Sequence, residues 1–134
     1  MSEREIRAFH ESFARCMANK HFFDNFYEAF LSNSEDVRRK LEGIDPRLHK
    51  RELRISLLIV VTAVIRKRKD MSLLEPTAAT HSHTGRNIEP HLDGFWLNAL
   101  LRSVEKSDTR FSEEIEKLWR QAFEPAVNYM SERY

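Results

Sequence analysis

The stretch "DPRLHKRELRISLLIVVTAVI", residues 45–65, decides the fold. Its first two residues are typical of a helix start, because an aspartate side chain can accept hydrogen bonds from the free amides of the first turn, and proline loses nothing at the first helical position. We expect this helix to run to about Arg66. Its centre is apolar on nearly all sides, which predicts a buried helix. A central helix of this kind favours a layered α-fold over a simple four-helix bundle.

The segments on both sides of this helix also have helical spacing, and none shows the alternation of a β-strand. Residues 2–5, "SERE", have the pattern of a capping box at a helix start. Pro125 should kink the last helix or interrupt its hydrogen bonds. The sequence therefore predicts an all-α fold of six to eight helices in one domain that spans residues 1–134.

Composition and charge exclude several classes of protein. The 22 basic and 21 acidic residues leave a net charge of +1, which is too small for a nucleic acid to be the main partner. A single cysteine, Cys16, cannot form an internal disulfide and fits a reducing compartment. The start of the chain lacks the apolar core of a signal peptide, and the longest apolar run, residues 57–65, is too short to span a bilayer. We expect a soluble cytoplasmic protein with no membrane partner.

Three of the six histidines lie close together in the sequence, at His81, His83 and His91. A His-x-His pair suits a zinc site on a β-strand, but on a helix the two side chains lie about 200° apart and cannot share one ion. Zinc also needs three or four ligands. In addition, the chain has no nucleophile elbow and no glycine-rich phosphate loop. Neither zinc binding nor nucleophilic catalysis is favoured.

A third interpretation makes one histidine the axial ligand of a planar cofactor. In a short helix that begins near residue 73, Leu74, Ala78 and His81 share one face. His81 closes this apolar face, whereas His83 points elsewhere. A histidine at the end of an apolar face is either a packed core residue or such a ligand, and the spacing alone leaves both open.

Several stretches together resemble one family, the globins, and most closely the bacterial single-domain globins and the haem modules of flavohaemoglobins and sensor globins. Residues 22–45, "FFDNFYEAFLSNSEDVRRKLEGID", look like the second and third helices and the corner that follows. Residues 49–61, "HKRELRISLLIVV", look like the distal helix. Residues 81–108, from "HSHTGRNIEP" onward, look like the proximal histidine, its corner and the next helix, and "LWRQAFEPAVNYMSERY" at 118–134 looks like the last helix. The resemblance implies a globin-like fold around a haem pocket.

The resemblance also implies roles for particular residues. "HS" followed by Ile88 and Pro90 places His81 in the proximal position, where it would bind haem iron; a shorter corner would select His83 instead. On the distal side, Tyr27 matches the tyrosine that hydrogen-bonds a bound gas and His49 matches the gate position. His49 is also a candidate second iron ligand. The remaining expected haem contacts are Leu41, Leu53, Leu57, Leu74, Ala78, Ile88 and Trp96.

Two residues depart from the family pattern. Leu41 stands where the family nearly always has a phenylalanine packed against the haem, and Asp93 stands where a tyrosine is usual. Loss of the aromatic side chain would weaken haem retention. Since some globin-fold modules in stress signalling bind no haem, Leu41 keeps a haem-free function open.

The expected function is therefore that of a globin, and not of an enzyme. The resemblance implies haem b (iron protoporphyrin IX) and reversible binding of O₂, with NO and CO as further candidate gases, for transport, storage or sensing. The first alternative is a haem-free signalling or interaction module. The second is nitric oxide detoxification, which would need an external reductase because the chain has no flavin or nicotinamide module. A sensor role would need a signalling partner protein, and a homodimer through the late helices is a further candidate assembly.

Overall fold

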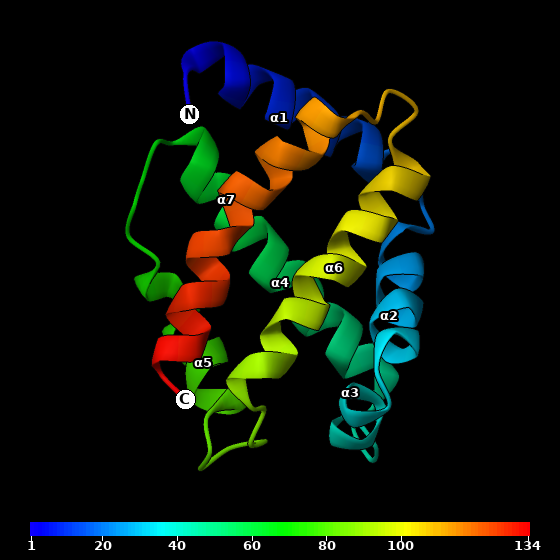
Figure 1. The fold of residues 1–134 in the computed structure, drawn as a ribbon, viewed down its shortest axis with the longest axis vertical. Helices are drawn as coiled ribbons and strands as arrows, with labels where there is room; N and C mark the ends of the chain where they lie inside the picture. Colours follow the sequence, from blue (N-terminus) through cyan, green and yellow to red (C-terminus); the bar gives the residue numbers. More distant parts are fainter.

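Seven α-helices and one 3₁₀-helix form the regular structure of residues 1–134, all of which the computed structural model describes (Figure 1). The chain contains no strand, so the predicted all-α fold is confirmed. None of the helices is sufficiently long and apolar to cross a membrane. In chain order the elements are α1 (Glu3–Met17), α2 (Phe22–Asn33), α3 (Glu35–Lys40), α4 (Pro46–Ile65), η1 (Ser72–Leu74), α5 (Glu75–His81), α6 (Pro90–Ser107) and α7 (Glu113–Glu132).

Side-chain caps stabilise the first turns of α1 and α4, as the sequence predicts. At the start of α1 the Ser2 hydroxyl accepts from the Glu5 amide at 3.1 Å, and the Glu5 carboxylate accepts from the Ser2 amide at 2.8 Å. At the start of α4 the Asp45 carboxylate accepts from the Arg47 amide at 3.0 Å. Each cap satisfies amides that have no partner within the helix. The predicted capping box and the aspartate-proline start of α4 are both confirmed.

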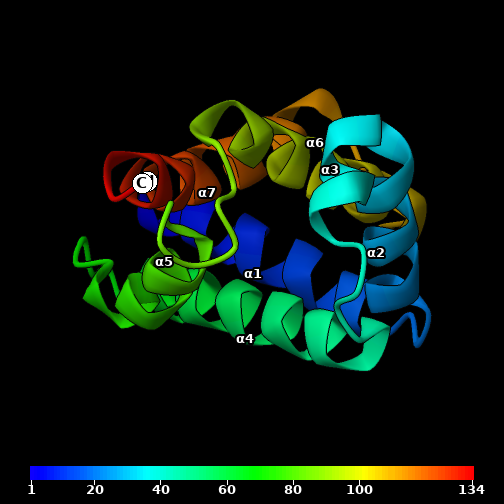
Figure 2. The same ribbon diagram turned by 90° about the horizontal axis from the view of Figure 1, so that it is seen from below.

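Helix α4 lies along one edge of the molecule, with the other helices on one side of it (Figure 2). Its inner face packs against α1, α2 and α7. Four large apolar side chains on its opposite face are exposed, so the prediction that α4 is buried on nearly all sides is wrong for that face. The physical reason is that the other long helices all pack on one side of α4 and leave its opposite side uncovered. The buried residues of α4 are His49, Leu53, Ser56, Leu57, Val60, Val61 and Ala63.

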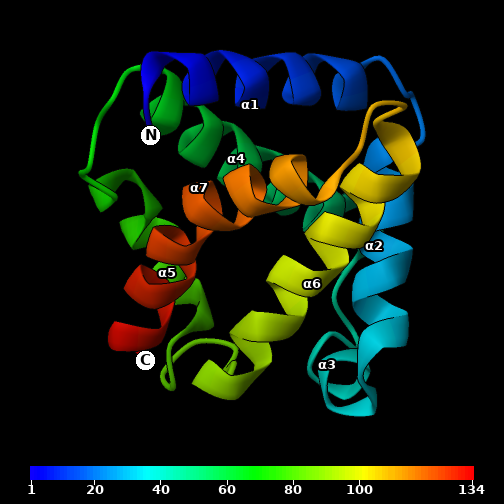
Figure 3. The ribbon, with the colours of Figure 1, turned by 45° about the horizontal axis from the view of Figure 1, so that its top comes forward.

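Helix α6 packs against both α2 and α7, and α1 lies across the top of the other helices in Figure 3. A continuous chain of aromatic rings connects four of these helices. Successive ring centroids along this chain are 4.9 to 5.7 Å apart, a separation at which each aromatic pair adds about 0.5–1.5 kcal/mol beyond the area it buries. In order the rings are Phe9 (α1), Trp119 and Phe123 (α7), Trp96 (α6) and Phe26 (α2).

A buried polar network around Asp108 joins the end of α6 to α1 and α7. The Asp108 carboxylate accepts from the Ser12 hydroxyl at 2.6 Å and from the Arg15 guanidinium at 2.5 and 3.0 Å. Ser12 in turn accepts from the Trp119 indole N–H at 2.9 Å. Burial alone would raise the pKa of Asp108, but the hydrogen bonds from Arg15, Ser12 and the Arg110 amide outweigh it and lower that pKa.

We expect Asp108→Asn to lower the free energy of unfolding by about 3 kcal/mol, because it leaves Arg15 without its buried partner. Because the pKa of Asp108 is lowered in the folded chain, its carboxylate also makes a pH-dependent contribution to the free energy of unfolding of the wild type. Its stabilisation is present above the ordinary aspartate pKa of about 3.9 and is lost as the pH falls through the lower pKa of the folded chain. Urea unfolding between pH 3 and 7 measures both effects.

In Asp108→Asn this pH-dependent contribution to the free energy of unfolding should be absent. The control is Asp36→Asn, because Asp36 is exposed and makes no ion pair; its unfolding free energy should stay within about 0.5 kcal/mol of wild type. Equal effects of the two substitutions would contradict a structural role for the Asp108 network.

Candidate functional site

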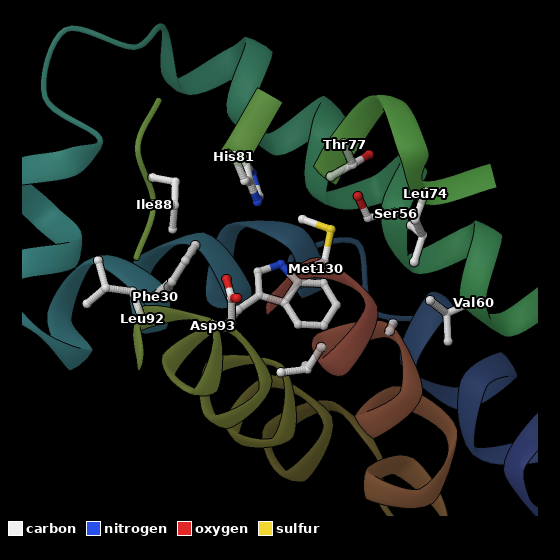
Figure 4. Close-up of a pocket in the computed structure, with 13 residues that line it drawn as sticks. Phe30, Ser56, Val60, Leu74, Thr77, His81, Ile88, Leu92, Asp93 and Met130 are labelled. Carbon is white, nitrogen blue, oxygen red and sulfur yellow. The ribbon is translucent and has the colours of Figure 1, made fainter. Parts of the chain in front are cut away.

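A cavity of about 50 Å³ lies between the inner face of α4, helix α5, the corner after it, and helices α6 and α7 (Figure 4). Nine of its 13 lining residues are hydrophobic, so a ligand inside it would contact a mainly apolar surface. The lining residues are Phe30, Ser56, Val60, Leu74, Thr77, His81, Ile88, Leu92, Asp93, Trp96, Ala126, Val127 and Met130.

His81 is the last residue of α5 and points into the cavity (Figure 4). Leu74, at the end of η1, and Ala78, in α5, are both buried, and Leu74 lines the same cavity. Burial, together with the nearby Arg86 cation, lowers the pKa of His81 to about 4, so its imidazole is neutral at neutral pH. Its Nδ1 atom is buried and has no hydrogen-bond partner.

The corner between α5 and α6, residues 82–89, is held by hydrogen bonds from its backbone amides to carbonyl groups in the last turn of α5. The Arg86 amide donates to the Thr80 carbonyl at 2.7 Å, and the Ile88 amide donates to the His81 carbonyl at 2.9 Å. Gly85 approaches this last turn so closely that a Cβ there would lie 2.2 Å from the Thr80 carbonyl oxygen. The corner therefore needs glycine, and its tight path brings Ile88 back to the same cavity as His81.

His83 lies outside the cavity and is exposed. Its Nδ1 atom and its backbone amide both lie within hydrogen-bond distance of the Tyr134 carbonyl, at 2.5 and 3.2 Å. The Tyr134 hydroxyl also donates to the Asn87 side chain. His83 thus fastens the corner to the end of α7. His91 is exposed and lines no part of the cavity.

His49 lies on the inner face of α4 and is 3% exposed. Its ring centroid is 5.3 Å from that of Tyr27 and 5.8 Å from that of Phe30, and Phe30 lines the cavity. Burial lowers the pKa of His49 to about 4, with a smaller contribution from the Arg86 cation, and its Nδ1 atom also lacks a partner. His49 is therefore a second neutral imidazole. It does not line the cavity itself but contacts Phe30, which does.

The predicted contact residues divide into two groups. His81, Leu74, Ile88 and Trp96 line the cavity. The others do not line it. The Tyr27 ring contacts the His49 ring, and the Nζ atom of Lys50 lies 5.5 Å from the centroid of the Tyr27 ring. The predicted residues that do not line the cavity are Tyr27, Leu41, His49, Leu53, Leu57 and Ala78.

Sequence reasoning missed several lining residues, of which Asp93 is chemically the most distinctive. Asp93 points into the cavity (Figure 4) and accepts from the Ser131 hydroxyl at 2.8 Å. Burial raises its pKa to about 6. The sequence showed only that an aspartate stood where an aromatic was expected. The other missed lining residues with no predicted role at the site are Phe30, Ser56, Val60, Thr77, Leu92, Ala126, Val127 and Met130.

An ion pair joins α4 to the corner, close to His49 and His81. The Arg86 guanidinium donates to both oxygens of the Glu52 carboxylate, at 2.6 and 2.9 Å. Burial is the main cause of the lowered pKa of both His49 and His81; the Arg86 cation lowers both further, whereas the Glu52 carboxylate raises both. No group of three or more histidine, cysteine, aspartate or glutamate side chains could hold a metal ion.

A solved structure is similar to this chain over nearly its whole length. It is a protein from Pseudomonas aeruginosa PAO1 that is described as structurally highly homologous to a human haemoglobin. The two chains are 29% identical, the match covers 97% of this chain and 98% of that one, and the TM-score is 0.87. No family model matches the chain. No curated protein matches it either.

We expect Gly85→Ala to lower the free energy of unfolding by about 1–3 kcal/mol, because its Cβ would collide with backbone oxygen atoms of α5. The matched control is Gly94→Ala in α6, where an added Cβ meets no atom within 4 Å. Alanine there should stabilise the helix by about 0.5–1 kcal/mol. Urea unfolding of both variants measures the difference, and effects of the same sign would contradict the close approach at Gly85.

Proposed function

We propose that this chain binds haem b through His81 and that the haem binds a diatomic gas. The globin-like fold and the resemblance to a single-domain bacterial globin, which are confirmed, support the proposal. The observation that carries the proposal is the placement of His81. It is a neutral imidazole at the end of a helix, directed into an apolar cavity, with His49 nearby.

The chemistry of the donor set fits haem. Haem iron takes a neutral imidazole nitrogen, and a histidine whose pKa is about 4 has that nitrogen free at neutral pH. Phe30 and Trp96 offer aromatic surface to a planar ring. The open space of about 50 Å³ is smaller than the roughly 300–1,000 Å³ of sites that hold drug-sized ligands. Loading therefore requires half-buried lining side chains, such as Met130 and Ile88, to move aside.

Haem would supply an iron centre at which a gas molecule binds reversibly. The chain would contribute the rest of the chemistry. His81 would hold the iron, and the apolar walls would exclude water that competes for it. His49 could donate a hydrogen bond toward the bound gas, worth roughly 0.5–1.5 kcal/mol, or about two- to tenfold in affinity. Tyr27 contacts the ring of His49, so we propose that it orients His49.

Reconstitution of the purified chain with hemin tests the proposal through the Soret absorption band. We expect the band in the wild type and in His83→Ala, because His83 lies outside the cavity. His81→Ala should lose the band or bind hemin at least about tenfold more weakly, since the iron loses its protein ligand. Loss of the band in His83→Ala alone would reverse the assignment, and its absence from the wild type would contradict haem binding.

A second prediction concerns the space inside the cavity. Met130→Ala removes a flexible side chain from the cavity wall, so we expect it to take up hemin faster and up to about tenfold more tightly than the wild type. The control is Met17→Ala, because Met17 is also half-buried and lies outside the cavity. Stopped-flow absorbance measures uptake, and equal rates for the two variants would show that Met130 does not limit entry.

The alternative function is that of a haem-free globin-fold interaction module. Two observations favour it: the small open volume, and the position of Leu41, which caps α3 and lines no part of the cavity. If the wild type and Met130→Ala both fold and both fail to bind hemin, the alternative replaces the haem proposal.

A further inference from the structure

The outer face of α4 gathers nearly all of the large apolar side chains that the molecule exposes. Leu48, Ile55, Leu58 and Ile65 are 46, 48, 42 and 36% exposed, and only one further large apolar residue, Leu73, is as exposed. All four lie on one side of a single helix, opposite the residues that face the cavity and core. Scattered apolar residues on a surface are ordinary, but a contiguous row marks an interaction site.

The spacing of this row fits a second helix. The four side chains follow one another at steps of seven, three and seven, which are the a and d positions of a heptad repeat. Arg51 and Thr62 occupy the two remaining positions of the seam and are also exposed. From Leu48 to Ile65 the seam is about 26 Å long at 1.5 Å per residue. This is enough for two to three heptads of a partner helix.

The unpaired charged side chains of α4 in and beside the seam are all positive. Arg47, Arg51, Arg54 and Arg66 are exposed on this face, and none of them makes an ion pair within the chain. The only acidic residue of α4 is Glu52, which is already paired with Arg86. A second copy of the chain would place arginines against arginines. A helix with glutamate or aspartate beside its apolar seam would complement the face in both respects.

We propose that the outer face of α4 is the docking surface for an amphipathic helix of a partner protein, with an apolar seam flanked by acidic residues. This inference is independent of haem, because the surface lies on the opposite side of α4 from the cavity. The same helix would then contact the partner on one face and form the cavity wall on the other, through Ser56 and Val60.

The test uses the full chain and two synthetic helical peptides of three heptads, about 21 residues. One peptide has leucine in its seam and glutamate at the flanking positions; the other has lysine in place of glutamate. We expect the acidic peptide to bind at least about tenfold more tightly than the basic one. In ¹H–¹⁵N NMR spectra of the chain, amide shifts should be confined to α4 and its immediate neighbours.

Two double variants probe the two properties of the surface. Ile55→Gln with Leu58→Gln removes apolar contact, and Arg47→Gln with Arg51→Gln removes charge; each should weaken binding of the acidic peptide about tenfold or more. The control is Arg4→Gln with Arg7→Gln on α1, where both arginines are exposed and unpaired. All these side chains are exposed, so thermal unfolding should confirm that every variant folds.

Three results would overturn the proposal. The first is no binding of the acidic peptide at millimolar concentration, or equal binding to the wild type and the two α4 variants. The second is a dimer in sedimentation velocity that the α4 variants convert to monomer, which would assign the surface to a second copy. The third is binding to phosphatidylserine vesicles through the same residues without peptide binding, which would assign it to an anionic membrane.

Discussion

One-sided burial of α4 is the constraint on which the rest of the structure depends. The helix is apolar on nearly all sides at its centre, yet α1, α2 and α7 cover only its inner face. The helices packed against that face form the core and the cavity and surround His49 and His81. No helix covers the outer face, so its apolar side chains from Leu48 to Ile65 are exposed. The two faces are rigidly joined, because they belong to one continuous helix of 20 residues.

The sequence predicted the elements of the fold better than their environment. Ser2, Asp45 and Pro46 marked helix starts correctly, since capping is local chemistry between residues two or three apart. The exposure of Ile55 and Leu58 could not be predicted in the same way. Periodicity reports which residues of a helix are apolar, whereas burial depends on how many other helices reach each side, and that is a property of the whole chain.

The candidate site shows the same division. Helical spacing in the sequence grouped Leu74, Ala78 and His81. In the structure Leu74 ends η1 and His81 ends α5, and both line the cavity, whereas Ala78 is buried without lining it. The position of His83 outside the cavity follows from the hydrogen bonds of the corner and from its contact with Tyr134, 51 residues away. On α2, the sequence favoured Tyr27, but the rotation of that helix brings Phe30 to the cavity. Asp93 gave no positive signal, because a lone polar residue in an apolar pattern has many explanations.

The polar groups in and beside the cavity are an argument for a ligand. His49 and His81 each keep a buried nitrogen without a hydrogen bond, and Asp93 keeps a largely desolvated carboxyl group with one partner, Ser131. An unsatisfied buried polar group costs about 1–3 kcal/mol, so apolar residues would stabilise this region if its only role were packing. A group that bound between α4 and α5 and used an imidazole nitrogen would offset part of this cost. The cost of burying these groups and the capacity of the site to bind a ligand would then have one physical origin.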